Sequence, residues 1–231
     1  MIRPPDPLLQ GRVALTYMVD TPSYLAVRHL LHLAFRDCET VLDLTYGHGR
    51  FWRPPLPPGI TLLRNTLDPE REAEYHCDYR ATNLPAESVD LAIFDPPHTA
   101  DNGATGHFRG LYGGTARGSR ALQTDIITGV REAWRLARIG ILVKVADSSH
   151  GGEFLYESGW VQSAIRLMPY AILHTVKKQP LTDPKHRVQR VPKSNGAVYL
   201  AFRKDQRKHT DWDMLYLRQQ ENGRADAERG A

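Results

Sequence analysis

Residues 89–98, VDLAIFDPPH, join an apolar run to an acid, two prolines and a histidine. Proline has no backbone N–H for a strand ladder, so consecutive prolines are not expected inside a strand. Pro96 and Pro97 therefore indicate a rigid turn directly after a buried strand. This turn is expected to hold Asp95 at a fixed place on the edge of the sheet. The question is which chemistry requires a carboxylate at that place.

Outward from this stretch, the chain alternates between strand-like and helix-like segments. Further strands are predicted over residues 40–47, 60–68, 74–78, 140–147, 171–178 and 196–204. Helices are predicted over residues 22–36, 120–138 and 153–160. This alternation favours an α/β fold with a seven-stranded, mostly parallel sheet and helices on both faces, in which the last two strands form an antiparallel pair. Ligands bind such sheets at the carboxyl ends of the strands.

The length and composition suit one α/β domain or two very small ones. The chain has 231 residues, of which 41% are apolar, and no apolar run reaches the roughly 20 residues of a membrane span. We expect one domain over residues 1–204, a polar and partly disordered tail over 205–231, and a cytoplasmic location. The formal charge of +4 is compatible with a nucleic-acid partner.

Cysteine and histidine spacing gives no metal signal. Cys38 and Cys77 form no zinc-type pair, and reduced thiols are the favoured state although a disulfide stays open. His29 and His32 lie one helical turn apart without a carboxylate or third ligand beside them. The sequence therefore predicts no metal site.

A second motif, LDLTYGHGRF at residues 42–51, carries two glycines after a strand. Gly47 and Gly49 allow positive φ angles and a close approach of the backbone to a ligand. A tight turn between a strand and a helix is the alternative explanation. Four prolines between residues 54 and 58 leave room for only a very short helix after this turn.

Two acids follow the next two predicted strands. Asp68 is placed where nucleotide sites use an acid to accept hydrogen bonds from ribose hydroxyls, but Pro69 after it also fits a helix N-cap. Asp78 is placed to accept from an adenine amino group, and a solvated loop residue is the alternative.

Taken together, these motifs resemble those of the S-adenosylmethionine-dependent amino-methyltransferases of the DPPY type. The family signature is Asp, Asn or Ser before two prolines and an aromatic residue, and Asp95, Pro96 and Pro97 match it with His98 in the aromatic place. The cofactor motif of the family, approximately D-x-F-x-G-x-G, is matched by residues 43–49, with Thr45 in the place of the Phe. The family also has a Thr-Pro pair before the helix that precedes this motif, and Thr21 and Pro22 match it. The resemblance covers about residues 15–203.

The resemblance implies a class I methyltransferase fold, which is Rossmann-like, with S-adenosyl-L-methionine as cofactor. It implies that the catalytic residues are Asp95, Pro96, Pro97 and His98. It places cofactor binding at Thr21, Pro22, Asp43, Thr45, Gly47, Gly49, Asp68, Asp78 and Asp95. In this family the acid and the first proline carbonyl accept the two N–H groups of an exocyclic amine, while the aromatic ring stacks on a flipped base.

Two segments are left for substrate contact because the chain has no room for a separate target-recognition domain. Residues 98–120 are rich in glycine and are expected to form a flap over the site. The second segment, 177–196, carries the expected nucleic-acid contacts Lys177, Lys178, Lys185, Arg187, Arg190 and Lys193, with an ordinary solvated loop as the alternative. Lys144 stands out in an apolar strand, and we expect its amine to reach the strand end or a partner.

The leading functional prediction is methylation of adenine N6 in DNA, with cytosine N4 close behind. An RNA methyltransferase that acts on guanine N2 or adenine N6 is the second hypothesis. A third is a nucleic-acid-binding subunit that needs a protein partner, or a homodimer, for target recognition. Hydrolase chemistry is disfavoured because Ser148-Ser149-His150 lacks the context of a nucleophile elbow.

Overall fold

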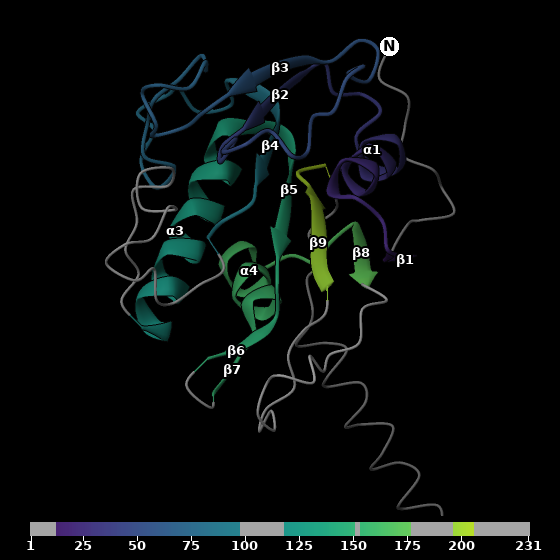
Figure 1. Cartoon of the computed structure of the whole chain (residues 1–231), viewed down its shortest axis with the longest axis vertical. Helices are drawn as coiled ribbons and strands as arrows, with labels where there is room; N and C mark the ends of the chain where they lie inside the picture. The colour runs from purple at the N-terminus through teal and green to yellow at the C-terminus, as the bar shows by residue number, and fades with distance from the viewer. Residues whose placement is uncertain (1–12, 98–117, 151–152, 177–195, 206–231) are drawn as a thin grey trace, which may run out of the picture.

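The computed structural model describes residues 13–97, 118–150, 153–176 and 196–205 (Figure 1). Its elements are β1 (Ala14–Val19), α1 (Ser23–Ala34), β2 (Thr40–Asp43), β3 (Thr61–Arg64), β4 (Val89–Phe94), α3 (Ser119–Leu136), β5 (Ala137–Val145), β6 (Ser148–His150), β7 (Glu153–Leu155), α4 (Glu157–Ile165), β8 (Ala171–Val176) and β9 (Gly196–Arg203). The tail expected after residue 204 lies outside the described residues from residue 206 onward.

The main sheet has seven strands in the order β1-β8-β9-β5-β4-β2-β3. β9 runs antiparallel to both β5 and β8, which confirms the antiparallel pair expected at the end of the chain. The remaining neighbours pair in parallel. The sheet is therefore mixed, whereas the sequence predicted a mostly parallel one. The reason is that β9 lies between β8 and β5 and runs antiparallel to both.

The seven strands are not the seven that the sequence predicts. Residues 74–78 form no strand, and Tyr75 makes only an isolated parallel bridge with Asn65. β1, which the sequence analysis did not predict, pairs with β8 at the opposite edge of the sheet. The helix predicted over residues 153–160 begins later, because β7 comes first and α4 follows at Glu157.

Helices cover both faces of the sheet (Figure 1). α3 and α4 pack on one face, where Ile126 and Val130 are fully buried against β4 and β5. α1 packs on the other face, where Val27 and Leu30 are fully buried. A mixed seven-stranded sheet between two helical layers is a three-layer α/β arrangement of the Rossmann-like kind. Within the described ranges, no helix has the length and apolar character to cross a bilayer.

The register of the sheet decides which strand ends meet. Asp43 at the end of β2 lies opposite Ile93, and Phe94 at the end of β4 lies opposite Val143. Because β2, β4 and β5 are parallel, their carboxyl ends lie at the same edge. The residues that follow in the chain, Asp95 after β4 and Lys144 on β5, are therefore brought side by side.

The close approach of β5 and β9 requires glycine at position 140. A Cβ there would lie 2.1 Å from the backbone oxygen of Phe202. We expect Gly140→Ala to lower the free energy of unfolding by about 3 kcal/mol, because a backbone atom of the neighbouring strand cannot yield. Gly59→Ala is the control: it meets no atom within 4 Å but has a φ of +79°, and we expect a loss of about 1 kcal/mol. Urea denaturation measures both, and equal losses would contradict the steric explanation.

Candidate active site

The carboxylate of Asp43 lies buried at the carboxyl edge of the sheet, with only 2% of the residue exposed. Its Oδ1 accepts a hydrogen bond from the backbone N–H of Thr45 at 3.1 Å, and its Oδ2 accepts one from the indole N–H of Trp52 at 2.7 Å. Asp43 therefore holds both ends of the glycine turn. Burial raises the pKa of Asp43 to about 7, although both hydrogen bonds act in the opposite direction.

The turn after β2 depends on its two glycines. Gly47 and Gly49 have φ angles of +49° and +64°, a region that side chains with a Cβ rarely adopt. A Cβ on Gly49 would lie 2.7 Å from the hydroxyl oxygen of Tyr46. The prolines after the turn are consistent with the absence of a helix between residues 50 and 60 of the described chain.

Asp95 lies next to this turn. Its backbone N–H donates to the hydroxyl oxygen of Thr45 at 2.8 Å, so the turn after β2 is joined to the segment that follows β4. Lys144 donates to both carboxylate oxygens of Asp95, at 3.0 and 2.9 Å, which confirms that its amine reaches a partner at the strand end. The Asp95 side chain is 26% exposed, and Pro96 beside it is buried.

Asp68 lies in a turn rather than at the start of a helix. Its Oδ1 accepts from the backbone N–H of Glu70 and its Oδ2 from Nε of Arg71, both at 3.1 Å. The helix N-cap alternative is therefore wrong, because the described residues after Pro69 form turns and no helix. The ribose-binding role stays a prediction, and two accepted hydrogen bonds leave further lone pairs on a carboxylate.

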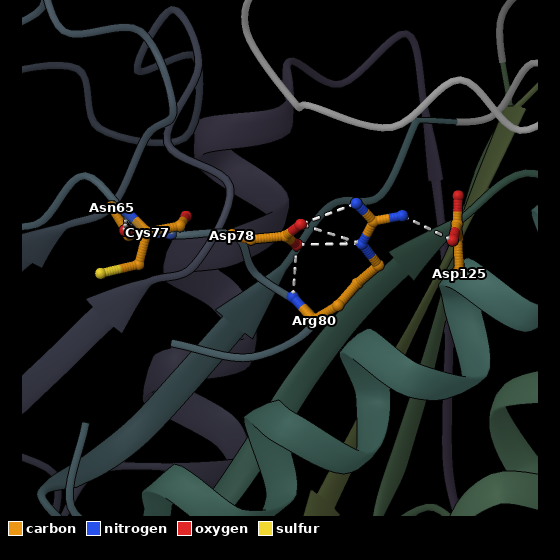
Figure 2. Close-up of polar contacts among 5 residues, drawn as sticks. All are labelled: Asn65, Cys77, Asp78, Arg80 and Asp125. Atoms are coloured by element: carbon orange, nitrogen blue, oxygen red, sulfur yellow. Dashed lines mark hydrogen bonds and ion pairs between the residues drawn. The ribbon is translucent and has the colours of Figure 1, made fainter. Parts of the chain in front are cut away.

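Asp78 is held by Arg80 (Figure 2). Its Oδ1 accepts from the backbone N–H and Nε of Arg80, at 2.9 and 3.0 Å, and its Oδ2 accepts from Nε and Nη2, at 3.2 and 2.6 Å. Nη1 of the same arginine donates to Asp125 on α3 at 3.0 Å. The hydrogen bonds from Arg80 hold the pKa of Asp78 below its usual range. Binding of an adenine amino group stays a prediction, and it requires Arg80 to release an oxygen.

Asn65, which sequence reasoning missed, joins three segments of this edge. Its amide nitrogen donates to the carbonyl oxygens of Leu44 and Cys77, at 3.0 and 2.9 Å. Its amide oxygen accepts from the backbone N–H of Cys77 at 2.9 Å (Figure 2 shows Asn65 beside Cys77). The signal available in the sequence was a polar residue directly after an apolar strand.

Both cysteines are free, and burial raises the pKa of Cys38 to about 12.

Thr21 and Pro22 lie between β1 and α1, and Pro22 takes the N-cap position of the helix without a side-chain cap. Thr21 donates its hydroxyl to the carbonyl of Val19 at 3.1 Å. Ser23, the first residue of α1, hydrogen bonds with Tyr199, whose pKa is raised by burial and further by the charge of Asp95. The start of α1 is therefore linked to the Asp95 side of the sheet through β9.

Several predicted site residues lie outside the described residues. These are His98 and the six cations Lys177, Lys178, Lys185, Arg187, Arg190 and Lys193. Most of the glycine-rich segment expected as a flap lies outside them too. Among the residues that the structure does describe, no cluster of three or more His, Cys, Asp or Glu side chains could hold a metal ion.

Comparison with known proteins finds likenesses only among solved structures, since no family model and no curated protein matches the chain. A candidate DNA modification methylase from Thermus thermophilus, solved with S-adenosyl-L-methionine, is 22% identical over 55% of this chain and 53% of that chain, with a TM-score of 0.35. The chain thus spans about half the length of that protein.

Two further likenesses are to methyltransferases. An S-adenosylmethionine-dependent methyltransferase from Aquifex aeolicus is 14% identical over 71% of this chain and 81% of that chain, with a TM-score of 0.36. A 1,6-didemethyltoxoflavin-N1-methyltransferase from Burkholderia thailandensis is 17% identical over 80% and 79%, with a TM-score of 0.42. Likenesses this distant do not assign a function to the chain.

The raised pKa of Asp43 predicts a pH dependence of stability. In the unfolded chain this group titrates near its ordinary value of 3.8, whereas in the folded protein it keeps its proton up to about 7. The stability is therefore fully present below about pH 4 and falls as the pH rises to 7, by roughly 4 kcal/mol at most. Asp43→Asn removes this titration.

Urea denaturation of both proteins measures the effect, at pH values from 4.5 to 7.5 in steps of about one pH unit. We expect the unfolding free energy of wild type to decline relative to Asp43→Asn over this range. Parallel pH profiles of the two proteins would show that Asp43 is ionised throughout in the folded state.

Proposed function

We propose that this chain is an S-adenosylmethionine-dependent methyltransferase that methylates an exocyclic amine of a nucleic-acid base, adenine N6 or cytosine N4 in DNA. The observation that supports this most is the placement of Asp95. Its carboxylate follows β4 directly, precedes Pro96 and Pro97, and stays 26% exposed beside the glycine turn after β2. An acceptor fixed beside a nucleotide-type turn suits a substrate that presents N–H groups.

The residues at the carboxyl edge fit the cofactor. The backbone at Gly47 and Gly49 has no Cβ to keep a ligand away, and the carboxylate of Asp68 is 25% exposed with lone pairs left for ribose hydroxyls. When bound, S-adenosylmethionine supplies an electrophilic methyl group on a sulfonium sulfur. Asp43, Thr45 and Asn65 keep this edge in shape through the hydrogen bonds described above.

The chemistry assigned to Asp95 follows from the weak nucleophilicity of a ring-conjugated amine. Such an amine shares its lone pair with the ring, so it attacks poorly. In the proposed site, Asp95 and the carbonyl of Pro96 accept its two N–H bonds, which favours a pyramidal nitrogen with a directed lone pair. The carboxylate also stabilises the positive charge that develops on nitrogen, and the two prolines after it restrict its orientation before the reaction.

The nucleic-acid partner is proposed from the same substrate chemistry and from the formal charge of +4. The six cations between residues 177 and 193 are assigned to phosphate contacts. A protein partner or a second copy of the chain is the proposed source of further target recognition, since the sheet and its helices account for most of the described residues.

The first experiment supplies S-adenosylmethionine with a labelled methyl group together with duplex DNA, single-stranded DNA or total RNA. We expect labelled N6-methyladenine or N4-methylcytosine after digestion of DNA to nucleosides. Asp95→Ala should lower turnover by about a hundredfold or more, because it removes the acceptor and the stabilising charge. Binding of the cofactor, measured by calorimetry, should change far less than turnover does.

Glu87→Ala is the control for this variant, since it removes an exposed carboxylate whose partner is Lys204 on another part of the surface. It should keep the wild-type rate. Label in RNA alone would favour the RNA hypothesis, and full activity of Asp95→Ala would rule out the alignment of the amine by this residue. Bound cofactor without any labelled base would favour a binding subunit that needs a partner.

Asp68→Ala should weaken cofactor binding by roughly ten- to a hundredfold, because a carboxylate that accepts from two ribose hydroxyls is lost. Isothermal titration calorimetry with S-adenosylhomocysteine measures this affinity. The exposed neighbour Glu70 provides the control, and Glu70→Ala should bind like wild type. An unchanged affinity of Asp68→Ala would restrict Asp68 to its role in the turn.

A further inference from the structure

Lys144 is a charged residue that the proposed reaction does not use. It lies near the carboxyl end of β5, among buried apolar neighbours such as Val143 and Val145. A lysine in such a strand is destabilising unless its ammonium finds a partner. Its side chain is 18% exposed, so the ammonium lies at the boundary between the sheet and the open carboxyl edge.

The surroundings of the ammonium are defined on three sides. Nζ donates to Oδ1 and Oδ2 of Asp95 at 3.0 and 2.9 Å. It lies 5.4 Å from the centroid of the Phe51 ring, and its charge acts on the buried carboxylate of Asp43. An ammonium has three N–H groups, so the two hydrogen bonds to Asp95 leave one for a ligand at the same edge.

Asp95 and Lys144 together present an acceptor and a donor side by side. A base amine donates hydrogen bonds, and in adenine and cytosine the ring nitrogen next to it, N1 or N3, is an acceptor. The pair therefore matches the amine and its neighbouring ring nitrogen in these two bases. On the Watson–Crick edge of guanine, the amine has N1–H beside it, and this donor would face the ammonium instead.

We propose that Lys144 is a specificity-determining residue that donates a hydrogen bond to the ring nitrogen beside the methylated amine. This proposal rests on the proposed function. On the Watson–Crick edge, it favours adenine or cytosine over guanine as the methylated base. A residue that only oriented Asp95 would not distinguish bases that differ solely at the ring nitrogen.

The test uses the DNA that wild type methylates, with the methylated base replaced by 1-deazaadenine or 3-deazacytosine. These analogues keep the amine and replace the ring nitrogen by C–H. The ratio of kcat/KM for the natural base to that for the analogue is measured for wild type and for Lys144→Met. The variant corrects for the different intrinsic reactivity of the analogue.

We expect the ratio of wild type to exceed that of Lys144→Met by roughly tenfold or more, as for the loss of one hydrogen bond to a charged group. Lys204→Met is the matched control, because Lys204 also pairs with a carboxylate, at 3.2 Å, and lies over an aromatic ring, that of Trp134. It should keep the wild-type ratio. Thermal unfolding checks that the variants fold, and Lys144→Leu replaces Lys144→Met should the latter not fold.

Equal ratios in wild type and Lys144→Met would overturn the proposal while the proposed function stands, because the natural base is still methylated. Methylation of guanine N2 in the identified product would overturn it as well. If wild type methylates no base at all, the proposed function fails together with this inference.

Discussion

The buried carboxylate of Asp43 is the constraint on which the rest of this edge depends. A side chain only 2% exposed must have its oxygens satisfied from within the chain, and Thr45 and Trp52 do so from the two ends of the glycine turn. Thr45 in turn accepts the backbone N–H of Asp95. One buried acid therefore shapes the loop after β2 and, through Thr45, the position of the Asp95 backbone after β4.

Polar residues at this edge are paired across long sequence separations. Asn65 joins Leu44 to Cys77, Lys144 meets Asp95, and Arg80 bridges Asp78 to Asp125. Such pairs keep buried and partly buried polar groups satisfied, but they also occupy acceptors that a ligand would use. Asp68 and Asp78 differ for this reason. Asp68 keeps lone pairs for a ligand, whereas Arg80 binds both oxygens of Asp78.

The fold was predictable where apolar patterns were strong and less so at the sheet edges. The central strands β4 and β5 are rich in apolar residues, and β2 contributes Val41 and Leu42, so the sequence located all three. β1 was not predicted because its exposed side chains Leu15, Tyr17 and Val19 are apolar. The alternation of polar and apolar residues that marks an edge strand is therefore missing from its sequence. The strand predicted over residues 74–78 does not form. Only Tyr75 joins the sheet there, through backbone hydrogen bonds with Arg64 and Thr66.

By itself, the sequence determined where the candidate site lies and which groups end its strands. Prolines, glycines and acids after apolar runs carry that information locally, since each acts on its own turn. Only the tertiary structure decided which side chains those acids meet, because the sheet order places β4 between β2 and β5. The partner of Asp95 comes from 49 residues along the chain, and no local pattern specifies a register over that separation.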